Sequence, residues 1–298
     1  MDYGRLKTTA ERYGAEYAEN VLLAPYTTFK IGGPCDVMVK PASAECLAEL
    51  VKTCREDGLP FRVLGKGSNV LVADEGLRCA VFVPVFADCE VQGDKLVCGA
   101  GASLVSACRT ALDNGLTGLE FAFGIPGTVG GALYMNAGAY GGEMKDVAIS
   151  CTYIDEKGDI RQMQAEEMSL SYRHSIFEEN GGIITSVTLQ LKEGVREEIS
   201  AKMNELMGKR RDKQPLDLPS AGSTFKRPQG DFAARLIEAS GLKGFSVGGA
   251  AVSEKHSGFV VNKDKATFAD VMKLIECVKE KVYADSGVML ECEVRIWR

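Results

Sequence analysis

The sequence GLEFAFGIPGTVGGALYMNAGAYGG, residues 118–142, decides how this chain is read. Eight of its 25 residues are glycine and its only charge is Glu120, yet apolar side chains such as Phe121 and Leu133 are interleaved with the glycines. Each glycine in a helix or strand costs about 0.5–1 kcal/mol relative to alanine, so ordinary core segments carry few. A polar linker would lack the apolar side chains. The stretch therefore predicts backbone folded closely around something bulky and flat, with its N–H groups turned inward.

A second glycine loop, Gly65-Lys66-Gly67-Ser68-Asn69, lies upstream between two strand-like runs, Phe61–Leu64 and Val70–Ala73. It lacks the G-x-G-x-x-G pattern that opens a helix in many nucleotide-binding folds. Taken alone, the loop is explained most simply as a tight hairpin, and the alternative is a set of N–H donors for a pyrophosphate. Together, one polar and one apolar loop suit a dinucleotide with a pyrophosphate and a ring system.

The composition sets limits on the class of protein. The 298 residues suffice for about two domains, and a net charge of −6 does not favour binding to nucleic acid or to anionic lipid. No apolar run approaches the roughly 20 residues of a membrane span, and the first 14 residues lack the apolar stretch of a secretory signal. We therefore expect a cytoplasmic protein without membrane insertion.

The ten cysteines are scattered without a C-x-x-C pair, and several, such as Cys46, Cys54 and Cys108, fall on apolar helix faces. We interpret them as reduced core thiols. The only histidines are His174 and His256, and no Cys, His and Asp spacing suggests a metal site. No metal is expected.

Periodicity predicts an α+β protein. Helices are expected over residues 1–20, from Ser43 to Gly58, over 103–114, from 194 to about 211, over 231–240 and over 267–285, the last opened by the capping pattern Thr267-x-x-Asp270. Strands are expected near 35–39, 61–64, 70–73, 80–83, 96–98, 148–154, 183–191 and 288–297. A boundary near Gly194 divides a larger N-terminal region from a smaller C-terminal one.

The motifs occur in an order that resembles a known family. The segments Pro25–Pro34, VLGKGSNVLV (63–72), GIPGTVGGALYMNAGAYG (124–141), Ser171–Phe177, Ser220–Lys226 and Leu290–Arg295 follow one another as in UDP-N-acetylenolpyruvoylglucosamine reductases. The resemblance covers nearly the whole chain and is closest to the compact second type of that enzyme. It implies a PCMH-type flavin fold in which residues 1–193 bind FAD, with lobes of about 1–85 and 86–193. Residues 194–298 would bind substrate, and the terminal strand 288–298 would return toward the flavin.

The resemblance also implies a reaction. Enzymes of this family reduce UDP-N-acetylglucosamine enolpyruvate to UDP-N-acetylmuramate for peptidoglycan, passing hydride from NADPH to N5 of non-covalent FAD and then to C3 of the substrate. Negative charge left on C2 and the carboxylate needs a cation and a proton donor. The matching positions are Arg173 as cation, Ser223 as proton donor to C2 and Glu293 as orienting carboxylate. Glu291 is the weaker alternative to Glu293.

The resemblance assigns the remaining site positions as well. Those expected to hold FAD are Thr28, Lys30, Gly32, Gly33, Leu64, Gly65, Lys66, Gly67, Ser68, Asn69, Val70, Leu71, Gly124, Ile125, Pro126, Gly127, Thr128, Gly130, Gly131, Asn136, Ala137, Gly138 and Ala139. Those expected to bind substrate are Tyr172, Lys226, Arg227 and Lys255. Arg227 departs from the asparagine that the family commonly has, and pairing with phosphate is one way it would serve. The run Lys209–Lys213 is another candidate for the diphosphate, with a solvated helix end as the simpler interpretation.

Each residue also has an ordinary interpretation. Ser223 would otherwise be a helix cap or turn residue, and Arg173 a surface arginine. Two other functions stay open: a flavin oxidase or dehydrogenase of another alcohol or hydroxy acid, and a catalytically inactive nucleotide-binding or scaffold protein. The first would not require Arg173, Ser223 and Glu293 together. The expected partners are the UDP-sugar and NADPH, with no nucleic acid, and the expected state is a monomer.

Overall fold

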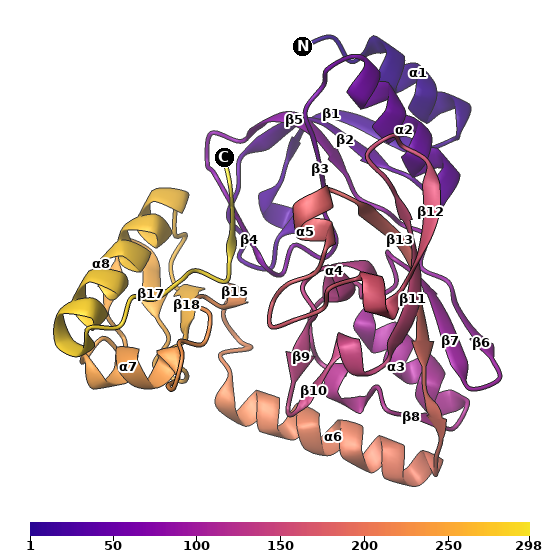
Figure 1. Cartoon of the computed structure of the whole chain (residues 1–298). Helices are drawn as coiled ribbons and strands as arrows, with labels where there is room; N and C mark the ends of the chain where they lie inside the picture. The colour runs from indigo at the N-terminus through magenta and orange to yellow at the C-terminus, as the bar shows by residue number, and fades with distance from the viewer. The chain divides into compact units, whose positions relative to one another are not determined.

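The computed structural model describes all 298 residues and divides them into two compact units (Figure 1). Unit 1 contains Met1–Glu19, Val37–Lys66 and Cys79–Lys209, and unit 2 contains Asn20–Asp36, Gly67–Arg78 and Arg210–Arg298. The sequence suggested a continuous division near residue 193, whereas this grouping is discontinuous. The N-terminal segments 20–36 and 67–78 join the C-terminal part of the chain because Phe29, Ile31 and Leu71 belong to its apolar core.

Unit 1 contains a four-stranded sheet in the order β1-β2-β5-β3. Three of these strands, β1, β2 and β5, also include residues that are grouped with unit 2. Its strands are β1 (Glu16–Leu22), β2 (Pro34–Lys40), β3 (Phe61–Val63) and β5 (Leu77–Phe82). Two neighbouring helices, α1 (Gly4–Arg12) and α2 (Ala44–Glu56), supply Leu6, Leu47 and Leu50 to its core. Ser43 caps α2 by accepting the N–H of Cys46, as the sequence predicted.

The second part of unit 1 is an antiparallel five-stranded sheet in the order β12-β11-β13-β7-β6. Its strands are β6 (Cys89–Gln92), β7 (Lys95–Gly99), β11 (Ala148–Ile154), β12 (Ile160–Gln164) and β13 (Ile183–Gln190). The helices α3 (Leu104–Asp113) and α4 (Val129–Tyr134) pack against it through Leu104, Val129 and Leu133 (Figure 1). Between them lie β8 (Leu116–Thr117), which pairs with β14 (Lys192–Glu193), and the 3₁₀ helix η2 (Glu120–Ala122).

After α4 come the short strands β9 (Gly138–Ala139) and β10 (Gly142–Glu143), and then η3 (Met144–Asp146). The segment between β12 and β13 contains η4 (Ala165–Glu167) and α5 (Phe177–Asn180). The long helix α6 (Arg196–Lys213) follows β14 and carries the chain from unit 1 into unit 2.

Unit 2 is built on an antiparallel sheet in the order β15-β18-β17-β16. Its strands are β15 (Ser220–Ser223), β16 (Ser246–Val247), β17 (Ala250–Val252) and β18 (Phe259–Asn262), and its helices are α7 (Ala233–Ala239) and α8 (Phe268–Ser286). The predicted capping box at Thr267 is present, and Val271, Ile275 and Val278 of α8 are fully or nearly fully buried. The 3₁₀ helix η1 (Ala24–Tyr26) and strand β4 (Val70–Val72) come from the two N-terminal segments.

Two predictions of secondary structure are wrong. The expected helix over residues 1–20 ends at Arg12, because Gly14 takes a left-handed φ of +63° and the chain turns into β1. The expected strand 288–297 is reduced to β19 (Arg295–Trp297), which pairs in parallel with β4. Residues 291–293 instead bond to the segment after β15, through the bridge between Phe225 and Cys292.

Candidate active site

The glycine-rich stretch in unit 1 forms a loop, residues 123–128, followed by α4. Thr128 is the N-cap of α4, and its Oγ1 accepts the N–H of Gly131 at 3.2 Å. The loop and the start of α4 are bonded to the chain after β7: Leu104 N–H donates to the Gly127 carbonyl at 3.0 Å and Gly130 N–H to the Ala100 carbonyl at 3.0 Å. The backbone of the loop is therefore fixed to the segment between β7 and α3.

The glycines of this region permit close packing within the protein. A Cβ on Gly65 would lie 2.6 Å from Thr128 Oγ1, and a Cβ on Gly130 would lie 2.7 Å from the Cβ of Ala100. A Cβ on Gly142 would meet the ring of Phe121 at 2.7 Å. The prediction that the glycines bring backbone close to a ligand is thus incomplete, because at these three positions the close neighbour is another part of unit 1.

Arg173 lies at the tip of a two-residue turn in unit 1. Ser171 and His174 exchange backbone hydrogen bonds of 3.1 and 3.2 Å, so Tyr172 and Arg173 form the turn between them. Arg173 has a φ of +57°, which is uncommon for a residue with a side chain, and its guanidinium lies 5.2 Å from the centre of the Tyr172 ring. A strained residue held by its surroundings is typical of functional sites.

The turn of Arg173 is anchored to the end of α4. Asn136, which is fully buried, donates through Nδ2 to the Ser171 carbonyl at 2.9 Å and to Glu143 Oε2 at 2.8 Å. Ser175 Oγ donates to the Tyr134 carbonyl at 2.7 Å. These bonds give Asn136 a positioning role that its assignment among the FAD residues did not anticipate. Ala137, Gly138 and Ala139 follow it directly, and the last two form β9.

The second half of the upstream loop, Gly67–Asn69, belongs to unit 2 and lies against η1. Gly67 packs its Cα against the backbone of Tyr26 and Thr27, and its carbonyl accepts the N–H of Thr28 at 3.1 Å. The backbone N–H groups of Gly67, Ser68 and Asn69 are not used in hydrogen bonds within the protein. Successive N–H groups of this kind suit a phosphate, so the loop fits the pyrophosphate of a dinucleotide.

The first FAD segment of the prediction, Thr28 to Gly33, packs on the same unit. Thr28 Oγ1 donates to the Ser220 carbonyl at 2.6 Å, and Lys30 Nζ donates to the Pro25 carbonyl at 3.2 Å. Gly33 N–H donates to the Ala73 carbonyl at 2.8 Å. A side chain at Gly32 or Gly33 would collide with the segment 72–76. These contacts bring Thr28 to the start of β15, which ends in Ser223.

Ser223 and Glu293 are brought together in unit 2 by Thr224. The Thr224 carbonyl accepts the N–H of Glu293 at 2.9 Å, its N–H donates to the Gly258 carbonyl at 2.9 Å, and its Oγ1 accepts the N–H of Val260 at 3.0 Å. Asn69 Nδ2 donates to the Glu293 carbonyl at 3.2 Å. Two of the three predicted catalytic residues therefore lie on adjoining segments, which also contact the loop 67–69. Sequence reasoning placed Thr224 and Asn69 within motifs but did not identify this function.

The expected substrate-binding cations of unit 2 all have interactions within the protein. Lys226 lies 3.5 Å from the carboxylate of Glu291, Lys255 Nζ donates to the Arg211 carbonyl at 2.6 Å, and Arg227 lies 4.4 Å above the ring of Phe232. The Glu291 side chain is 73% exposed. This pair explains Glu291 as a surface carboxylate, and Lys255 as a cap for the C-terminal end of α6.

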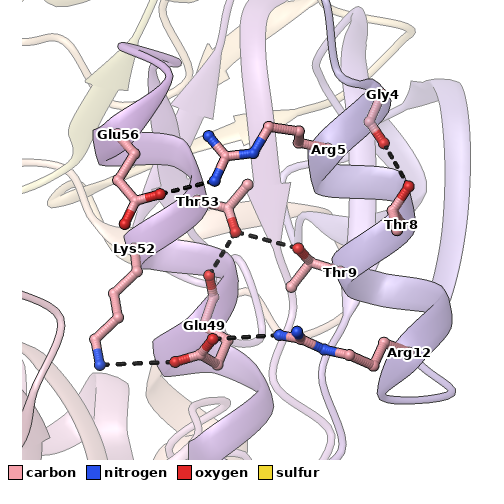
Figure 2. A pocket seen from close by; sticks show the side chains of 9 residues that line it. All are labelled: Gly4, Arg5, Thr8, Thr9, Arg12, Glu49, Lys52, Thr53 and Glu56. Atoms are coloured by element: carbon pink, nitrogen blue, oxygen red, sulfur yellow. Dashed lines mark hydrogen bonds and ion pairs between the residues drawn. The ribbon is translucent and has the colours of Figure 1, made fainter.

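The groove in Figure 2, of about 410 Å³, lies between α1 and α2. Its cations are paired with carboxylates: Arg5 with Glu56 at 2.7 Å, and Arg12 and Lys52 with Glu49 at 3.2 and 3.6 Å. None of the predicted site residues lines it, so it is a surface ion-pair network and not a dinucleotide site.

No group of three or more His, Cys, Asp or Glu side chains is arranged to hold a metal ion. No helix combines the length and apolar character that crossing a membrane requires.

Comparison with known proteins agrees with this arrangement. Residues 214–297 match the sequence profile of the UDP-N-acetylenolpyruvoylglucosamine reductase C-terminal domain, and residues 35–164 match that of an FAD binding domain. The UDP-N-acetylenolpyruvoylglucosamine reductase of Clostridium novyi is 49% identical over 94% of this chain and 92% of its own length. That of Caldanaerobacter subterraneus is also 49% identical, over 91% of this chain and 90% of its own.

Solved structures give the same result for the fold. The UDP-N-acetylenolpyruvylglucosamine reductase from Thermus caldophilus is 38% identical and superposes with a TM-score of 0.82, covering 95% of this chain and 99% of its own. An alkyldihydroxyacetonephosphate synthase is 16% identical, with a TM-score of 0.50 over 65% of this chain and 41% of its own. The expected PCMH-type FAD-binding fold with an added C-terminal α+β part is confirmed.

Proposed function

The chain belongs to the UDP-N-acetylenolpyruvoylglucosamine reductase family, and on that premise we propose that it reduces UDP-N-acetylglucosamine enolpyruvate to UDP-N-acetylmuramate for peptidoglycan, with FAD as cofactor and NADPH as reductant. The observation that carries the proposal is the hydrogen bond from Glu293 N–H to the Thr224 carbonyl. This bond joins the segment of Ser223, the expected proton donor, to that of Glu293, the expected orienting carboxylate. Another flavin-dependent reaction would not require these two residues on adjoining segments.

The two glycine loops would hold FAD by different means. The N–H groups of Gly67, Ser68 and Asn69 would donate to the pyrophosphate, and the loop 124–128 would supply the apolar backbone surface for the ring system. FAD held there would supply the two-electron chemistry that links NADPH to C3 of the enolpyruvyl group. The role of the protein is to place the substrate and to manage charge and protons.

Arg173 would stabilise the charge that develops on the substrate. Reduction at C3 leaves an enolate-like C2 and carboxylate, and a guanidinium binds a carboxylate through two parallel hydrogen bonds. The bonds from Asn136 and Ser175 that anchor its turn support this role, since they limit where the Arg173 side chain can reach. Tyr172, beside it, would bind the substrate through its hydroxyl.

Ser223 would donate the proton to C2. A serine hydroxyl is a weak acid, so the transfer needs a neighbouring group that stabilises the oxygen as the proton leaves. Glu293 would orient the substrate and the hydroxyl from the adjoining segment. C3 thereby gains hydride, C2 gains the proton, and the carbon–carbon double bond of the enolpyruvyl group becomes single.

Arg227 is the cation that we favour for the substrate diphosphate. Its guanidinium is held over the Phe232 ring, and its planar fork suits bidentate bonds with phosphate better than the point charge of a lysine does. Lys226 and Lys255 would first have to leave Glu291 and the Arg211 carbonyl, respectively. A lysine ammonium binds phosphate as a point charge, so we rank both below Arg227.

We further propose a cytoplasmic monomer. None of the ten cysteines forms a disulfide and seven of them are buried, which fits a reducing compartment. Light scattering on the purified protein tests the monomer, because a dimer would double the measured mass.

The variant Ser223→Ala tests the mechanism. We expect the flavin to be reduced by NADPH at the normal rate, and the reoxidation by the enolpyruvyl sugar to slow by about 10²–10⁴-fold. The matched control is Ser220→Ala in the same strand, which should change neither step by more than about threefold. Normal reoxidation in Ser223→Ala would remove Ser223 as the donor and leave the flavin chemistry intact.

A further inference from the structure

Two cysteines of unit 1 face each other across the hairpin formed by β6 and β7. Cys89 is paired with Cys98 in the antiparallel register, and the strands are joined by the turn between Gln92 and Lys95. Gly99 N–H donates to the Asp88 carbonyl at 2.9 Å. Because hydrogen-bonded and non-hydrogen-bonded pairs alternate along an antiparallel ladder, the next pair, Cys89 and Cys98, is non-hydrogen-bonded.

This position has the spacing that a disulfide needs. Non-hydrogen-bonded antiparallel pairs have Cα atoms about 4.5 Å apart, and disulfides span Cα distances of roughly 4.4–6.8 Å. Cys89 and Cys98 can therefore be joined without moving the backbone far.

The two thiols differ in exposure and acidity. Cys98 is fully buried in the core, whereas Cys89 is half-buried on β6, the edge strand of its sheet. The hydrogen bond from the Cys98 thiol lowers the pKa of Cys89, while that bond and burial raise the pKa of Cys98. Cys89 is thus the thiol that ionises first and that an oxidant can reach, and Cys98 stays protonated beside it.

We propose that Cys89 and Cys98 form a redox-active dithiol that hydrogen peroxide converts into a cross-strand disulfide. The Cys89 thiolate attacks one peroxide oxygen, the O–O bond breaks, and hydroxide leaves as Cys89 becomes a sulfenic acid. The Cys98 sulfur then attacks the Cys89 sulfur, the S–O bond breaks, and the thiol proton departs with that oxygen as water. Two electrons pass from the two thiols to the peroxide, and a dithiol reductant reverses the change.

The main alternative to Cys98 as the disulfide partner of Cys89 is Cys108. Cys108 lies on α3 with its thiol directed to the Leu119 carbonyl at 3.3 Å, and burial raises its pKa to about 12. Helix α3 packs against β6, the strand that carries Cys89. The opposed register favours Cys98, and the test must separate these two partners.

The experiment treats the FAD-loaded protein with peroxide, blocks the remaining thiols with N-ethylmaleimide and digests with trypsin. Cleavage after Arg78, Lys95 and Arg109 places Cys89 and Cys98 in separate peptides, 79–95 and 96–109. We expect these peptides to be joined, two thiols to be lost, and dithiothreitol to restore both. Fragmentation of the joined peptides should assign the link to Cys89 and Cys98, since each peptide carries a second cysteine.

Three variants separate the alternatives. Cys98→Ala should abolish the link and leave Cys89 as a sulfenic acid that dimedone traps, and Cys89→Ala should abolish both. Cys108→Ala, the matched control in the same tryptic peptide, should leave the link unchanged. If Cys98→Ala fails to fold, the loss of the link in Cys89→Ala, a substitution at the sheet edge, tests the proposal instead. A link that survives Cys98→Ala, or peroxide loss of thiols without any link, would overturn the proposal.

Discussion

Replacing Gly65 by alanine is expected to disturb the loop of α4 through a single contact with Thr128. The new Cβ would lie 2.6 Å from Thr128 Oγ1, closer than real Cβ atoms come to a neighbour. The Thr128 hydroxyl caps α4 by accepting the Gly131 N–H, so moving it away loses the cap. Loss of a threonine cap costs about 0.5–2 kcal/mol and overpacking costs about 1–3 kcal/mol, so we expect a loss of about 1–2 kcal/mol.

A double-mutant cycle tests this reasoning. Thr128→Ala removes Oγ1 and leaves the Thr128 Cβ position 3.6 Å from the new Cβ, an ordinary contact. It should cost about 1 kcal/mol alone, and Gly65→Ala should then add almost nothing, which corresponds to a coupling of about 1–2 kcal/mol. The matched control is Gly127→Ala, whose Cβ would meet nothing closer than the Leu104 Cδ1 at 3.6 Å.

The assay is urea unfolding of FAD-free protein followed by far-UV circular dichroism, because bound FAD would mask the change in unfolding free energy. Flavin fluorescence titrations of the same variants would show whether FAD affinity follows stability. Additive losses in the double mutant, or an equal loss in Gly127→Ala, would refute the account of the Gly65 contact.

Three further predictions concern the rest of the molecule. Arg173→Lys should lower kcat by about 10²–10³-fold without slowing flavin reduction by NADPH, and equal slowing of both steps in stopped-flow traces would contradict its role as the substrate's cation. Asn136→Ala should destabilise the protein by about 2–3 kcal/mol in urea, because it removes bonds to the Ser171 carbonyl and to Glu143; a loss below about 0.5 kcal/mol would argue against the anchoring role. Burial lowers the pKa of His256 below its ordinary 6.5, so the unfolded state binds the proton more readily and stability should fall as pH drops through 6.5. Fluorescence of the single tryptophan, which lies in the same unit, reports that unfolding, and His256→Asn should remove the pH dependence.

Local patterns predicted most of the helices and strands. Ser43 and the capping pattern at Thr267 located the starts of α2 and α8, and the apolar spacing in α8 located its buried face. These features depend on residues within a few positions of one another, so they can be read from sequence. The N-terminal helix was predicted too long because helical residues continued past Gly14, and one glycine in the left-handed region ended it.

Long-range pairing could not be read in the same way. The parallel pairing of β19 with β4 joins Arg295 to Val70, across most of the chain, and no local pattern announces it. The same holds for Thr224, whose N–H and hydroxyl bond to the segment 258–260 and whose carbonyl bonds to Glu293. Such contacts between distant parts of the sequence are the reason that unit 2 consists of three separate segments.

The role of the glycines could be predicted only in part from the sequence. Their density predicted close approach of backbone, but not whether a ligand or the protein itself lies opposite. At Gly65, Gly67 and Gly130 the neighbour that excludes a Cβ is protein, and next to Gly67 the backbone N–H groups also remain available for phosphate. Sequence composition cannot distinguish these cases, since both require the absence of a Cβ.

The most direct test of the central claim is a visible spectrum of the purified protein, followed anaerobically through NADPH and then UDP-N-acetylglucosamine enolpyruvate. We expect flavin absorbance that bleaches with NADPH and returns in full with the enolpyruvyl sugar, with UDP-N-acetylmuramate formed in equal amount. Bleaching that the sugar does not reverse would contradict the proposed substrate, and a protein that neither contains nor takes up FAD would contradict the account as a whole.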